Sequence, residues 1–141
     1  MRTVSMRIIL VFVGLIASSA SAVSADRPLP RDKAIPARLA RLPAWQAAAV
    51  CNQVMVKPFV AKAKAAGGLA PFDAEANRLG DLTRLFFVAA REILVADRKL
   101  TRPSAAHLAY QEGNRWSPTT VTVAQCIAFA PVMQRMISNL E

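Results

Sequence analysis

The residues whose chemistry the sequence defines best are its two cysteines, Cys51 and Cys126. In an oxidising compartment an even pair is most simply a disulfide, which here would close a loop of about 75 residues. A pair of free thiols and metal ligation are the alternatives. Metal ligation is weakly supported, because the chain has no CxxC motif and His107 is its only histidine. We therefore predict a Cys51–Cys126 disulfide, no metal site and no cofactor.

The sequence offers little for hydrolytic catalysis. A cysteine nucleophile needs a free thiolate, and a serine nucleophile would have to use His107, which Ser104 precedes by three residues on one helical face. No third group of a triad is placed by the sequence. Glu92 and Glu112 lie beside apolar positions and could titrate abnormally, but ion pairs with neighbouring arginines are the simpler interpretation. We therefore predict a protein that is not an enzyme.

Three arginines suggest a binding surface instead. Arg84, Arg91 and Arg98 recur every seven residues, so on a helix they would form a basic line about 21 Å long, opposite the apolar face. This line could contact an anionic partner. The alternative is an ordinary solvated helix face.

A second candidate for binding follows in the chain. Tyr110, Arg115 and Trp116 lie close together in sequence, and aromatic residues with arginine on a loop are typical of binding hot spots. Alternatively, Trp116 plugs the end of the bundle and holds the loop. We predict that the arginine line and the 110–116 segment together form the binding surface.

A carrier function is a further hypothesis. Flexible methionines near the cysteines could line an adaptable apolar pocket, and ordinary core packing is the alternative. The pocket would be lined by Met55, Phe59, Phe129 and Met133.

Residues 1–25 have the features of a cleaved secretory signal peptide. Arg2 and Arg7 precede an apolar run at 8–17, and small residues follow up to Ala25. The apolar run is shorter than the roughly 20 residues that a membrane span needs; an uncleaved anchor is the alternative. We therefore predict a periplasmic or secreted protein without a transmembrane span in its mature chain.

The charge of the chain bears on its partners. The chain has 18 basic and nine acidic residues, and removal of the two signal arginines leaves a net charge of +7. Such a charge favours an anionic surface or an acidic envelope protein, although solubility alone could explain it. Nucleic acid is a poor partner outside the cytoplasm, so we do not expect it.

The rest of the chain divides into an arm and one domain. Residues 26–36 are charged, contain three prolines and are expected to be extended. Residues 37–141 are rich in alanine and poor in strand signals, which predicts a single helical domain. Helices are expected from about 43 to 67, from 74 to 99, from 103 to 113, and from 117–120 almost to the C-terminus.

Capping residues, glycine and prolines set the expected ends and bends of these helices. Asp73 is a suitable N-cap, Pro103 suits the first position of a helix, and Gly113 suits its end. Pro58 and Pro131 should kink or break the helices that contain them. The second helix carries the clearest apolar stripe, at Leu79, Leu82, Phe86, Ala89, Ile93, Ala96 and Leu100.

These features together predict an all-α fold: a small irregular bundle of about four helices with proline kinks and one disulfide that joins the first and last helices. This plan of export signal, small helical domain and single disulfide resembles that of several periplasmic groups, which include acid-stress chaperones and immunity proteins that neutralise secreted toxins. As an alternative function, the resemblance implies a helical protein of the immunity or chaperone type.

Overall fold

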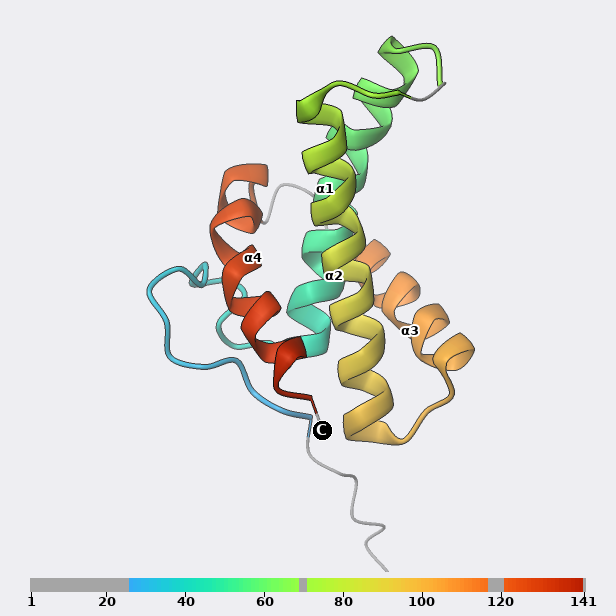
Figure 1. Ribbon diagram of the computed structural model, residues 1–141. Helices are drawn as coiled ribbons and strands as arrows, with labels where there is room; N and C mark the ends of the chain where they lie inside the picture. The colour runs from blue at the N-terminus through green and yellow to red at the C-terminus, as the bar shows by residue number, and fades with distance from the viewer. Residues whose placement is uncertain (1–25, 69–70, 117–120, 141) are drawn as a thin grey trace, which may run out of the picture.

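The computed structural model describes residues 26–68, 71–116 and 121–140, and in these ranges the regular structure is entirely helical (Figure 1). The predicted all-α fold with four helices is confirmed. The predicted signal peptide, 1–25, lies outside the described residues. In chain order the helices are α1 (Ala44–Ala65), α2 (Ala74–Arg98), α3 (Arg102–Arg115) and α4 (Val123–Ser138).

α1 ends at Ala65, just before a pair of glycines and close to the expected end at 67. Gly67 and Gly68 both have positive φ, at 76° and 73°. The Gly68 N–H donates to the Ala63 carbonyl and the Gly67 N–H to the Lys64 carbonyl, which together form a Schellman motif. Pro58 lies inside α1 and does not end it, although it cannot donate a helical hydrogen bond.

α2 begins as predicted. The Asp73 carboxylate accepts a hydrogen bond of 2.7 Å from the backbone N–H of Ala76. The buried face of α2 is wider than the predicted stripe, because Ala90 and Leu94 are also fully buried. Figure 1 shows the end of α1 and the start of α2 extending beyond the other two helices as a hairpin.

The expected end of α3 at Gly113 is wrong. α3 continues to Arg115, and Gly113 lies inside it, buried against α1. A Cβ atom at Gly113 would lie 2.7 Å from the Ala49 carbonyl oxygen and 2.7 Å from Cγ of Gln53. The glycine therefore permits close helix packing and does not serve as a C-terminal cap. Pro103 occupies the second helical position, one residue later than predicted.

α4 begins later than the predicted range of 117–120, which lies outside the described residues. Its N-terminus is closed by a capping box: the Thr122 side chain accepts from the Gln125 N–H, and the Gln125 side chain accepts from the Thr122 N–H. This motif places the first helical residue at Val123. Pro131 lies inside α4 and, like Pro58, does not end its helix.

The disulfide joins the first and last helices, as predicted. Cys51 and Cys126 are both fully buried, with Cα atoms 5.5 Å apart. Next to this link, the rings of Phe86 and Phe129 stack with centroids 5.9 Å apart, so α2 and α4 share the same core.

The segment before α1 folds back onto the bundle. Pro28 and Pro43 form an isolated antiparallel bridge, and the Ala44 N–H donates to the Arg27 carbonyl at 3.0 Å. Arg27 is itself held by Asp97 near the end of α2, through its backbone N–H and its guanidinium, each at 2.8 Å. The residues predicted to be an extended arm, 26–36, contain no helix and are fastened at their beginning to α2.

Candidate functional site

The arginine line on α2 is largely engaged in contacts within the protein. Arg98 donates two hydrogen bonds to Asp26, at 2.9 and 2.8 Å, and its guanidinium lies 5.1 Å from the ring centroid of Trp45. The Arg98 hydrogen bond lowers the pKa of Asp26 below its usual value, and Asp26 in turn raises the pKa of Arg98. Arg98 thus secures the N-terminal segment to the bundle.

Arg91 is also engaged. Its Nε donates to Oε1 of Glu92 at 2.7 Å, and its guanidinium lies 5.6 Å from the ring centroid of Phe87. Of the three arginines, only Arg84 is exposed without an ion-pair partner among the described residues.

The 110–116 segment is similarly divided. Tyr110 is 61% exposed, whereas Arg115 forms an ion pair with Glu112 at 3.0 Å. Trp116 packs against the core next to Val50 and Gly113, around a small hollow of about 230 Å³. The structure therefore favours the interpretation in which Trp116 closes the bundle. Four of the six residues of the predicted surface contact other side chains of the protein, although the Arg115 side chain remains 73% exposed. Arg84 and Tyr110 are also exposed.

The two carboxylates singled out for possible acid–base chemistry are both paired with arginine, which confirms the simpler interpretation. Glu112 contacts Arg115, and its Oε2 accepts a hydrogen bond of 3.3 Å from Gln46. Glu92 accepts from Arg91 and from Arg102, whose Nε lies 3.0 Å from Oε1. The hydrogen bond from Arg102 is the main reason why the pKa of Glu92 is lowered, and the bond from Arg91 lowers it further.

The remaining polar candidates do not converge. His107 is exposed on α3, and the Ser104 hydroxyl accepts a hydrogen bond of 3.0 Å from the Thr101 hydroxyl at the N-terminus of that helix. In the described part of the chain, no three His, Cys, Asp or Glu side chains come together in a way that could hold a metal ion.

The apolar residues proposed to line a carrier pocket are mostly core residues. Met55, Phe129 and Met133 are fully buried. Phe59 packs edge-on against Phe72 at 6.2 Å between ring centroids and lies against Gly80. The Phe129 ring stacks on Phe86 and so occupies part of the space that a ligand of the proposed carrier would need.

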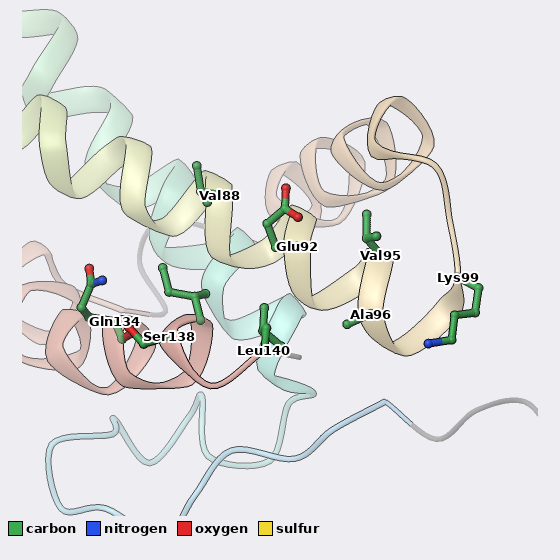
Figure 2. A pocket seen from close by; sticks show the side chains of 9 residues that line it. Val88, Glu92, Val95, Ala96, Lys99, Gln134, Ser138 and Leu140 are labelled. Carbon is green, nitrogen blue, oxygen red and sulfur yellow. The ribbon is translucent and has the colours of Figure 1, made fainter.

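A concave surface instead lies between the C-terminal halves of α2 and α4 (Figure 2). It is an open groove of about 670 Å³, within the range of typical binding sites. Its apolar lining comes from both helices and the C-terminal residues that follow them: Val88, Val95, Ala96, Ile137 and Leu140. Its polar lining comes from Glu92, Lys99, Gln134 and Ser138. Sequence reasoning missed this groove.

The charge in the groove is locally balanced. Figure 2 shows the Glu92 carboxylate directed away from α4, and the carboxylate is neutralised by its arginine partners. Lys99, whose left-handed backbone ends α2, lies at one end of the groove (Figure 2). An apolar occupant would therefore meet apolar side chains from both helices, with the paired Glu92 between Val88 and Val95 and Lys99 at one end (Figure 2).

A signal for this groove was present in the sequence. Val88 and Val95 are seven residues apart, so they share a face of α2 that is outside the main apolar stripe. Two β-branched residues on the outward face of a helix indicate a second contact surface.

A second open hollow, of about 520 Å³, lies at the other end of α4, next to Val123 and Ile127.

Comparison of the chain with models of protein families, with curated proteins and with solved structures finds no match. None of the described helices is long and apolar enough to cross a membrane. The buried disulfide is compatible with an extracellular or periplasmic protein.

Proposed function

We propose that this chain is an exported, non-enzymatic binding protein that holds an apolar segment of a partner protein in the groove between α2 and α4. The observation that carries the proposal is the groove itself, with its apolar lining from both helices. Two neighbouring helices with an apolar hollow between them are a common way to hold an amphipathic helix. The partner's apolar side chains would recur at spacings of three, four and seven residues.

The openness of the groove supports a polypeptide occupant. Sites for small molecules bury most of the ligand surface, whereas this groove is bounded by only two helices and leaves one side of an occupant uncovered. A partner helix supplies its own polar face for that side. Export through residues 1–25 to the periplasm or the medium is part of the proposal, supported by the signal-like segment and the disulfide.

A photocrosslinking experiment tests the proposal. A benzophenone amino acid replaces Val95 in the groove or, as a control, exposed His107 on α3. Irradiation of cells that export the protein should give a discrete adduct from Val95 but not from His107. The adduct should disappear when Val88→Glu places a charge in the groove, with melting of the variant as the check on folding.

The second candidate is a carrier of a small apolar ligand, favoured by the groove volume of about 670 Å³. A native mass spectrum of the purified protein separates the two functions. A retained small molecule that is lost in Val88→Glu, without any crosslinked protein, would replace the first proposal by the second. Equal crosslinking from both positions, or none from Val95 and no retained mass, would refute a binding function for the groove.

A further inference from the structure

The N-terminal segment forms a closed loop with its own internal structure. Its ends meet where Pro28 bridges Pro43, which gives it the form of an Ω-loop. Within it, the Leu39 N–H donates to the Pro36 carbonyl at 2.9 Å and the Leu42 N–H to the Leu39 carbonyl at 2.9 Å. The loop is therefore a folded element.

Apolar residues of this loop point into the core. Leu39 is fully buried and Ile35 is 8% exposed, and both belong to the main hydrophobic cluster. Arg31, Lys33, Arg38 and Arg41, which lie beside these anchors in the chain, are exposed. Figure 1 shows the loop standing out beside α4, in agreement with the Asp32–Arg135 contact.

The exposed charges of residues 31–41, which we name the basic loop, are all positive except one. Arg31, Lys33, Arg38 and Arg41 are exposed and have no ion-pair partner among the described residues. The single acid, Asp32, accepts from Arg135 at 3.0 Å and from the Ala34 N–H at 2.9 Å. Asp32 is occupied by these contacts, so four cations remain available on one folded loop.

We propose that the basic loop is the surface through which the protein associates with a bilayer that contains anionic lipids. Each cation close to such a bilayer strengthens binding about fivefold. The loop has no aromatic residue on which nucleic-acid bases could stack. Since its one leucine, Leu39, and its one isoleucine, Ile35, pack in the core, the association is electrostatic, without insertion into the lipid. The surface is independent of the groove between α2 and α4.

Vesicle sedimentation tests this inference. The protein is purified from the exported fraction, with its denatured mass recorded to establish whether residues 1–25 are present. It is mixed with vesicles of phosphatidylcholine, with or without 30% phosphatidylglycerol. We expect binding only to the anionic vesicles, and loss of that binding in 1 M salt, where the screening length is about 3 Å.

Two matched variants locate the surface. The loop variant carries four changes: Arg31→Gln, Lys33→Gln, Arg38→Gln and Arg41→Gln. The control variant removes the same charge from exposed positions of α1 and α2: Lys57→Gln, Lys64→Gln, Arg78→Gln and Arg84→Gln. The loop variant should bind anionic vesicles more weakly by two to three orders of magnitude, following the fivefold factor for each charge. The control variant should lose less than tenfold.

Three outcomes would overturn the inference. Equal losses in the two variants would mean that net charge, and no particular surface, attracts the protein to lipid. Unchanged binding in the loop variant would place the surface elsewhere. Absence of vesicle binding, with salt-sensitive binding of polyglutamate that requires the basic loop, would identify an acidic protein as the partner. Thermal melting of both variants verifies that each is folded.

Discussion

Replacement of Gly113 by alanine should destabilise the protein, although alanine is the better helix former. In a helix interior the change alone would stabilise by up to about 1 kcal/mol. Here the new Cβ would lie 2.7 Å from the Ala49 carbonyl oxygen, and ordinary contacts begin at 3.4 Å. α3 would have to withdraw from α1 or distort, and overpacking of this kind costs about 1–3 kcal/mol.

The net expectation for Gly113→Ala is a loss of about 1–2 kcal/mol, which corresponds to a Tm lower by roughly 4–8 °C. Thermal melting followed by circular dichroism measures it. Gln53→Ala in the same background should restore only part of the loss, because it removes the side-chain contact at 2.7 Å and leaves the backbone contact.

Gly113→Asn separates this explanation from a helix cap. A left-handed cap position tolerates asparagine better than alanine, whereas a close helix contact tolerates the larger asparagine less well. We expect Gly113→Asn to be less stable than Gly113→Ala. An alanine variant as stable as the parent protein, or an asparagine variant more stable than the alanine variant, would refute the close packing of α3 on α1.

Three further predictions concern the disulfide, the ion pairs and a helix cap. Replacing Cys51 and Cys126 by alanine should lower the free energy of unfolding by about 4–5 kcal/mol, because the disulfide closes a loop across 75 residues; urea denaturation measures this loss. The lowered pKa values of Asp26 and Glu92 mean that their ion pairs stabilise the protein fully above the ordinary carboxyl pKa and progressively less below it, so Tm should fall as the pH decreases below about 4.5. Thr122→Ala removes the capping box of α4 and should cost about 1 kcal/mol, measured by urea denaturation.

Each of these has a contradicting result. Equal urea midpoints for the disulfide variant and the parent would show that the link adds nothing to stability. For the ion pairs, a Tm that is constant from pH 7 to 2, or the same acid profile after Asp26→Asn and Glu92→Gln, would exclude their contribution. An unchanged midpoint in Thr122→Ala would mean that the cap does not stabilise α4.

Local sequence signals determined the helical class and several helix boundaries. The Asp73 cap, the glycine pair that ends α1 and the stripe on α2 depend on neighbouring residues in the chain, which is why sequence alone predicted them. The disulfide followed from the number of cysteines, because one pair allows only one connectivity.

Gly113 shows where local reasoning fails. The same residue can end a helix through its positive φ or allow a close approach between two helices, and sequence does not distinguish these uses. The choice depends on Ala49 and Gln53, which are about 60 residues away in the chain. Likewise, the distance between the N-terminal segment and α2 in sequence concealed the pairing of Asp26 with Arg98.

The candidate binding surfaces were likewise determined partly by the sequence and partly by the tertiary structure. Sequence by itself determined the excess of basic over acidic residues and the high apolar content. Only the tertiary structure decided which of them remain available: it engages Arg91 and Arg98 internally and leaves the basic loop exposed. It also places α4 against α2, so that Val88 and Val95 line a groove. The physical reason is that helix identity arises from contacts within a few residues, whereas a binding surface is what remains uncovered after all distant contacts have formed.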